Sequence, residues 1–302
     1  MSLRAFTWVL AVTIAAGVSG CSVSQKTVVK PGQAPAPLQI ATKEQLIAQY
    51  EREAQAIHSL NAAVTMKLTA GSAYSGVIEQ YHEVKGFILA QEPASIRVIG
   101  QAPVVGKNIF DMVSDGETFR IFIPPKNKFL VGSAKLERPS AKPIENLRPQ
   151  HILDALFFKP IPRSTVVLFE EAGDAASHFY VLTVVRQSSD SATRAYSPGS
   201  MDWEIALKIW FDRTNLSIAR VQTFGPVGKL MSDVQYSAWQ PVESASYPRQ
   251  IAMNQPANDY QLQIGIEKLT VNEAIAADRF QLQQPPGTEL VRVGEEAKEV
   301  QP

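Results

Sequence analysis

The residues able to carry covalent or acid–base chemistry are few in this sequence. Cys21 is its one cysteine, and a thiolate is a strong nucleophile and metal ligand. The four histidines are His58, His82, His151 and His178. No two of them have a metal-ligand spacing such as H-x-x-x-H, and "YHEVKG" lacks the second histidine of a zinc-protease helix. The sequence therefore predicts no metal site.

Other catalytic patterns are missing from the sequence as well. It contains no G-x-S-x-G nucleophile turn and no glycine-rich phosphate loop. Glu170 and Glu171 are neighbours in a strand-like stretch, where adjacent side chains point to opposite faces, so they form a poor acid–base pair. We therefore expect no enzymatic activity and no cofactor, although residues distant in the sequence could still converge.

Cys21 stands at the end of an apolar leader. Arg4 supplies a positive charge, and residues 5–18 are mostly apolar. That length is typical of a signal peptide, because a membrane-spanning helix needs about 20 apolar residues. The small residues Ser19 and Gly20 admit a peptidase close to the backbone on the amino side of Cys21.

The motif Val18-Ser19-Gly20-Cys21 resembles the bacterial lipobox. The resemblance implies that residues 1–20 are a lipoprotein signal peptide, and that Cys21 becomes the lipidated first residue of the mature chain. Several acyl chains on one cysteine anchor a protein stably, since each buried methylene contributes about 0.8 kcal/mol. A plain secretory signal followed by an incidental cysteine is the alternative.

Ser22 bears on the choice of membrane. An aspartate after the lipidated cysteine favours inner-membrane retention in enterobacteria, and this chain has serine there. We therefore expect a lipoprotein of the outer membrane that faces the periplasm, with inner-membrane anchoring as the other possibility.

Composition separates a tether and a tail from one large domain. Residues 21–41 contain Pro31, Pro35 and Pro37 among small polar residues, which is typical of a semi-extended spacer. Residues 42–293 form the expected domain, and residues 294–302 read as a charged tail. Lysine plus arginine and aspartate plus glutamate number 29 each, so no net field attracts nucleic acid. We recognise no internal repeat.

Two helices are expected. Thr42 and Gln45 fit a capping box, and Leu46, Tyr50 and Ala54 continue at helical spacing as an apolar stripe. A second, short helix is predicted in "RPQHILDALF", where Pro149 suits the first turn and the prolines beyond residue 159 end it.

The rest of the domain has the two-residue period of strands. Asp115-Gly116, between "IFDMVS" and "ETFRIFI", indicates a hairpin turn. In "DWEIALKIWFD" the residues expected on one face are Trp203, Ile205, Leu207, Ile209 and Phe211. About ten or eleven strands with one early helix predict a mainly β (α+β) fold, a strongly curved antiparallel sheet packed on the N-terminal helix.

The order of these elements resembles the LolA/LolB-like superfamily of periplasmic lipoprotein carriers and receptors, in its uncharacterised outer-membrane lipoprotein branch. The stretches that carry the resemblance are "IFDMVSDGETFRIFIPPKNKFLVG", "LKIWFDRTNLSIARVQTFGPVGKLMSDVQYSAW" and "NEAIAADRFQLQQPPGTELV". With the lipobox and the first helix they cover most of the mature chain. The resemblance implies an incomplete β-barrel with a helical lid that binds acyl chains in its apolar interior.

Candidate acyl-chain-lining residues come from strands whose alternation is expected to face the helix. They are Phe87, Leu89, Met112, Phe119, Ile121, Ile123, Trp203, Ile205, Leu207, Leu262 and Ile264. The same residues would serve as plain core in any sheet packed on a helix.

One loop resembles the apolar loop that LolB-type receptors project toward the membrane. It lies in "GQAPVVGKN", and its candidate residues are Pro103, Val104, Val105 and Gly106. An ordinary turn with a packed valine pair is the alternative.

Two functions follow as hypotheses. The first is a binding protein, anchored to the membrane through its lipid, that receives, carries or inserts acylated protein or phospholipid cargo in outer-membrane trafficking. The second is a non-enzymatic docking scaffold or sensor in cell-envelope assembly, with a filled interior and an apolar patch such as "LFFKPIP", residues 156–162.

Overall fold

The computed structural model describes residues 37–72, 77–102, 106–135, 146–174, 177–188 and 203–293. The expected leader, Cys21, nearly all of the tether and the charged tail lie outside these residues. Residues 1–37 and residues 38–302 are two separate units, and the fold described below belongs to the second.

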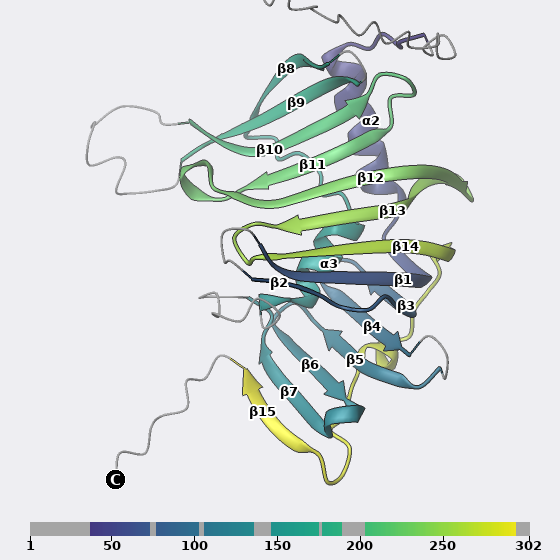
Figure 1. Cartoon of the computed structure of the whole chain (residues 1–302). Helices are drawn as coiled ribbons and strands as arrows, with labels where there is room; N and C mark the ends of the chain where they lie inside the picture. Colours follow the sequence, from purple (N-terminus) through teal and green to yellow (C-terminus); the bar gives the residue numbers. More distant parts are fainter. Residues whose placement is uncertain are drawn as a thin grey trace, which may run out of the picture. The chain divides into compact units, whose positions relative to one another are not determined.

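Fifteen strands of the described residues form one sheet (Figure 1). In the first half of the sheet they are β1 Ser59–Ser72, β2 Val77–Gln80, β3 Val84–Gln91, β4 Ser95–Gln101, β5 Asn108–Ser114, β6 Thr118–Ile123 and β7 Lys128–Ser133. In the second half they are β8 Val166–Gly173, β9 His178–Gln187, β10 Trp203–Asp212, β11 Ile218–Phe224, β12 Leu230–Val242, β13 Ala245–Gln255 and β14 Tyr260–Val271, and β15 Glu289–Val293 follows. Their spatial order is β15-β7-β6-β5-β4-β3-β1-β14-β13-β12-β11-β10-β9-β8, with β2 beside β1.

The expected fold class is confirmed: a curved, almost wholly antiparallel sheet packs on an N-terminal helix (Figure 1). The structure has more strands than the ten or eleven expected. One of the additional strands is β7, which the short 3₁₀ helix Pro124–Lys126 separates from β6. Another is β15, which lies in the closing stretch and is too short to show alternation.

Helix α2, Lys43–Ala56, begins at the predicted capping box. The Thr42 hydroxyl accepts a hydrogen bond from the Gln45 amide at 3.3 Å, and the Gln45 side chain accepts one from the Thr42 amide at 2.8 Å. Leu46, Tyr50 and Ala54 form its buried stripe. We call the face of the sheet that packs against α2 and α3 the inner face.

Helix α3, Pro149–Leu156, lies on the same inner face and contacts β4 and β5 (Figure 1). Its last carbonyls have no partner inside the helix, as at any helix end. The hydroxyl of Tyr236 donates to the Ala155 carbonyl at 3.1 Å, and the hydroxyl of Tyr247 donates to the Leu156 carbonyl at 2.7 Å. The sheet therefore caps the helix with two buried tyrosines.

A third tyrosine holds the other end of α3. The Tyr260 hydroxyl lies 2.6 Å from Nδ1 of His151, and the two rings stack. Burial lowers the pKa of His151 to about 4, so the imidazole is neutral at pH 7 when it shares this hydrogen bond with the Tyr260 hydroxyl. Three side chains of the sheet thus fix the position of α3.

A segment that we call the strap, residues 272–288, crosses the outer face of the first half-sheet. Asn272 begins it, with its side chain accepting from the His58 amide at 2.9 Å and donating to the Ala56 carbonyl at 2.7 Å. Arg97 Nη1 donates to the Arg279 carbonyl in the middle of the strap at 2.9 Å. After the strap, β15 pairs parallel with β7 at the sheet edge.

Replacing Tyr247 by phenylalanine should lower the free energy of unfolding by about 1–3 kcal/mol, because it leaves the buried Leu156 carbonyl unsatisfied. Urea unfolding of the full chain measures this. Tyr81→Phe is the matched control, since the Tyr81 hydroxyl is exposed and bonds only Glu79. Equal losses in the two variants would contradict the capping role.

His151 should make the protein less stable as the pH falls. Its folded-state pKa lies below the ordinary value, so the unfolded state takes up the proton first, and stability is lost progressively from about pH 6.5 to about pH 4. Between pH 7 and pH 5 we expect a loss on the order of 1 kcal/mol that is absent in His151→Gln. His178→Gln, at an exposed histidine, should keep the wild-type slope.

Candidate binding site

The inner face of the sheet is apolar across its whole width. In the first half, one row of paired residues runs across five strands: Ala62, Ile88, Val98, Met112 and Ile121. In the second half, another row runs across six strands: Leu182, Ile209, Val221, Val234, Met253 and Leu262. Residues paired in this way share one face, so each row is a continuous apolar band.

An aromatic cluster fills the middle of the inner face. Phe158 follows α3, and its ring centroid lies 5.0 Å from that of Tyr236, 5.9 Å from Tyr50 and 6.2 Å from Trp239. The indole of Trp239 donates to the Ile218 carbonyl at 3.0 Å. The cluster joins α2, the end of α3 and the second half-sheet.

The interior is a dry, low-dielectric environment. Burial raises the pKa of Tyr50, Tyr236, Tyr247 and Tyr260, so all four hydroxyls remain neutral donors. Such an environment suits an uncharged apolar ligand, since a charge placed there would lose its hydration.

The two helices are attached to the sheet unequally. Three buried tyrosines bind α3, whereas the three hydrogen bonds seen among the described residues between α2 and the rest of the domain, of which one is the Asn272 bond to the Ala56 carbonyl, are exposed or only partly buried. Gln49 Nε2 donates to the Leu216 carbonyl at 2.6 Å, and Glu51 Oε1 accepts from the Ile161 amide at 2.8 Å. Helix α2 is therefore the less firmly held cover of the inner face.

Seven of the eleven expected lining residues lie on the inner face. They are Met112, Phe119, Ile121, Ile123, Leu207, Leu262 and Ile264. Met112, Phe119, Leu262 and Ile264 are fully buried, and the others are partly exposed. Arg148 lies 5.1 Å above the ring of Phe119.

The other four lie on the outer face, and the expectation that they face the helix is wrong. In β3 the inner positions are Ile88 and Ala90, so Phe87 and Leu89 point outward, and Phe87 is 42% exposed. In β10 a β-bulge between Ile205 and Leu207 shifts the pairing by one residue. Trp203 and Ile205 therefore face away from the helices, and Trp203 is 48% exposed.

Two further expectations concern apolar segments. "LFFKPIP" was expected as an exposed patch, but Leu156, Phe157 and Phe158 are buried in the core, because the chain turns inward after α3. In the expected membrane loop, Gly106 is exposed and has a φ of 62°, which glycine accepts readily. Pro103, Val104 and Val105 lie outside the described residues, so the membrane role of this loop stays a prediction.

Sequence reasoning missed Phe158 and the buried tyrosines as parts of the site. The tyrosines at 236, 247 and 260 share the inner-face alternation of their strands, which was a usable signal. Phe158 had no such signal, because it follows a helix and precedes Pro160.

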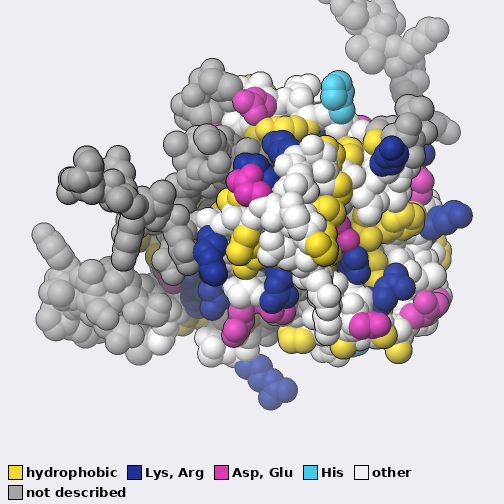
Figure 2. Space-filling model, turned by 90° about the horizontal axis from the view of Figure 1, so that it is seen from below, with side chains coloured by type: hydrophobic (Ala, Val, Ile, Leu, Met, Phe, Trp, Pro, Cys, Tyr) yellow, Lys and Arg dark blue, Asp and Glu magenta, His cyan; other side chains and the backbone are white. Residues whose placement is uncertain are grey.

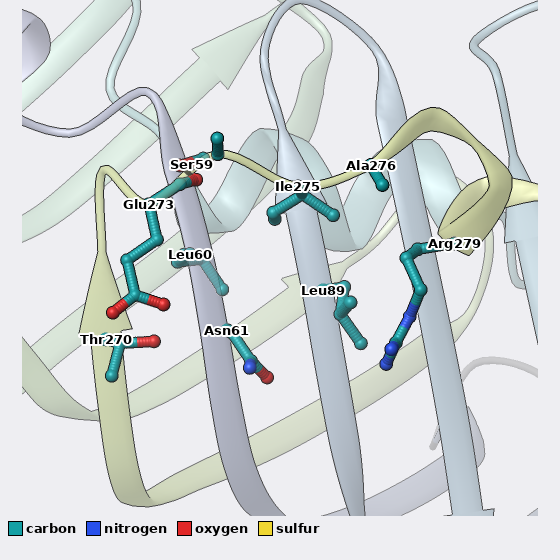
Figure 3. A pocket seen from close by; sticks show the side chains of 10 residues that line it. Ser59, Leu60, Asn61, Leu89, Thr270, Glu273, Ile275, Ala276 and Arg279 are labelled. Carbon is teal, nitrogen blue, oxygen red and sulfur yellow. Dashed lines mark hydrogen bonds between the residues drawn. The ribbon is translucent and has the colours of Figure 1, made fainter.

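A cavity of about 300 Å³ lies between the strap and the outer face (Figure 3). Its floor is one row of paired residues, Thr270, Asn61 and Leu89, on three adjacent strands. Figure 3 shows Glu273 near one end and Arg279 near the other. The strap keeps Leu89 buried, although this side chain lies on the outer face.

A second hollow, of about 590 Å³, lies on the outer face of the second half-sheet. We call it the outer groove. Its lining residues include Phe179, Trp210, Ala219, Arg220, Gln235, Gln250, Ala252 and Gln263. Its lining is more polar than the inner face.

Other kinds of site find no support in the described part of the chain. There, no group of three or more histidine, cysteine or acidic side chains is placed to hold a metal ion. None of the helices described is both long and apolar enough to cross a membrane. On the face shown in Figure 2, basic, acidic and apolar side chains are interspersed.

Solved structures similar to this chain include two bacterial proteins. A DUF1329 family protein from Desulfovibrio piger is 11% identical, with a TM-score of 0.51, over 78% of this chain and 94% of the other. A LolA superfamily protein from Nitrosomonas europaea is 10% identical, with a TM-score of 0.46, over 80% of this chain and 99% of the other. At 11% identity, the similarity to the DUF1329 family protein concerns the fold alone.

No protein-family model matches the sequence, and no curated protein matches it either.

Proposed function

We propose that this chain is a membrane-anchored lipoprotein that binds an acyl chain, of a lipid or of a lipidated protein, between the inner face of its sheet and helix α2. The observation that carries the proposal is the continuous apolar inner face beneath a helix whose hydrogen bonds to the rest of the domain are exposed or only partly buried. In this proposal the protein moves lipid or lipoprotein cargo at the outer membrane, faces the periplasm and catalyses no reaction.

The free energies of apolar burial favour replacement of α2 by an acyl chain. A chain with about 14 methylene groups contributes on the order of 10 kcal/mol when it leaves water. Displacing the buried stripe of α2, which is Leu46, Tyr50 and Ala54, costs about 5 kcal/mol of apolar burial. The acyl chain can therefore replace the helix on the inner face, and α3 stays in place because the tyrosines hold it.

The seven inner-face candidates have the chemistry that this function needs. They are aliphatic, sulfur-containing or aromatic, and the apolar rows give the acyl chain a surface several strands wide. Specificity for the acyl chain would come from exclusion of charge rather than from hydrogen bonds.

The structure gives less support to the docking scaffold with an exposed apolar patch. That hypothesis relied on an exposed patch at residues 156–162, and the apolar residues at the start of that segment are buried.

Bromine quenching locates the bound chain. A fatty acid brominated at mid-chain, added to the full chain in a nanodisc, should quench the fluorescence of Trp239, because this indole borders Phe158 on the inner face. Most of the quenching should disappear in Trp239→Phe and persist in Trp203→Phe, whose indole is on the outer face. Persistence in Trp239→Phe with loss in Trp203→Phe would contradict the proposal.

Lipidation of Cys21 is tested separately. Cells given a labelled palmitate should label the wild-type chain, and Cys21→Ser should lose both the label and its recovery with membranes. Ser22→Ala, one residue away, should keep both. A labelled Cys21→Ser chain would refute the anchor proposed here.

A further inference from the structure

Two hairpins share a short pattern of residues, although the chain as a whole has no recognisable repeat. Residues 97–111 read "RVIGQAPVVGKNIFD" and residues 220–233 read "RVQTFGPVGKLMSD". Both begin with Arg-Val, contain Pro-Val followed by Gly-Lys, and end in Asp. The first copy has one extra residue, a second valine before the Gly-Lys pair, so the shared residues are not at identical spacing.

The strands of the two copies pair in the same way. Each copy is an antiparallel hairpin, β4–β5 or β11–β12, with its arginine and aspartate paired on the outer face. Arg97 Nε donates to Asp111 Oδ1 at 3.0 Å and Nη2 donates to Oδ2 at 2.7 Å. Arg220 makes the same two bonds to Asp233, with Nε donating to Oδ1 at 2.6 Å.

The arginines differ in their third nitrogen. Arg97 Nη1 donates to the Arg279 carbonyl, a backbone group of the strap. Arg220 Nη1 has no hydrogen bond among the described residues, and Arg220 lines the outer groove. The first copy therefore binds a backbone carbonyl of the short 3₁₀ helix η4, Ala277–Phe280, and the second copy presents the same donor to an open groove.

The neighbours of the two arginines correspond as well. Leu89 is paired with Arg97 on the adjacent strand, and Trp210 is paired with Arg220 in the same way. The strap buries Leu89. Trp210 remains partly exposed in the groove, where its ring meets the edge of Phe179 with centroids 5.7 Å apart. An apolar contact is available beside the donor in both places.

The charge of Arg220 does not select an anion. Asp233 already neutralises the guanidinium through two bonds, so what remains is an N–H donor suited to a neutral carbonyl. Gln235, Gln250 and Gln263 line the same groove, and each amide can both donate and accept, as a peptide backbone does.

We propose that the outer groove binds a polypeptide segment of a partner protein. A backbone carbonyl of that segment accepts the Arg220 Nη1 proton, and an apolar side chain of the segment packs on Trp210 and Phe179. Recognition is mainly of backbone, so a peptide with the strap's own sequence is a sufficient probe. This inference does not depend on acyl-chain binding.

The test is ¹⁹F NMR of the full chain labelled with 5-fluorotryptophan. The resonance that is missing in Trp210→Phe is assigned to Trp210. A synthetic peptide of residues 273–284, "EAIAADRFQLQQ", should shift that signal saturably at millimolar concentration. Ala252→Lys, which fills the groove from an exposed position, should weaken the effect at least tenfold. Gln261→Lys, exposed on the same face but outside the groove, should leave the effect unchanged.

Three outcomes would overturn the proposal. The Trp210 signal could stay unmoved by the peptide, or move equally in Ala252→Lys. It could respond instead to an oligosaccharide of N-acetylglucosamine, which would make the groove a glycan site. Quenching of Trp239 by the brominated fatty acid would be unaffected in each case.

Discussion

Hydrogen bonds from the buried tyrosines of the sheet to α3 determine how the interior is filled. Tyr236 and Tyr247 satisfy the carbonyls at the end of the helix, and Tyr260 holds His151 at its start. Each bond lies in a low-dielectric environment, where it is strong and where its loss leaves a polar group without water. Because the end of α3 is fixed, Phe158 is placed at the centre of the inner face. The aromatic cluster, and through it the seat of α2, depends on this arrangement.

The unequal attachment of the two helices gives the domain a fixed part and an exchangeable part. The sheet and α3 share buried hydrogen bonds, whereas the hydrogen bonds of α2 are exposed or partly buried and its buried stripe makes non-directional apolar contacts. Another apolar group of similar width, such as an acyl chain, can make contacts of this kind equally well. The outer face is organised differently, since the strap, β15 and the arginine–aspartate pairs are all held by backbone or charge-assisted hydrogen bonds.

Local chemistry made much of this fold predictable from the sequence. The capping box at Thr42, the proline at the start of α3 and the Asp-Gly turn all act within a few residues, and the structure contains each of them. The predictions from sequence failed where tertiary contacts determine which face of the sheet a side chain occupies. The bulge in β10 reverses the facing of Trp203 and Ile205 without any glycine or proline to mark it. In β3 the residues on both faces of the strand are apolar, so the sequence pattern does not show which of them face the helices. Phe158 and the pattern shared by the two hairpins required contacts between residues far apart in the chain.

The parallel pairing of β15 with β7 has a consequence for how molecules of this protein meet one another. An uncovered β7 would offer a row of free amides and carbonyls to any passing strand, and such edges lead to edge-to-edge polymers. The chain covers this edge with β15, which the strap leads across the outer face. The outermost strand here is therefore only five residues long, and short edge strands limit such pairing. Protection from polymerisation therefore depends on a short strand that is separated from its partner by more than half of the chain and pairs only when the whole domain is present.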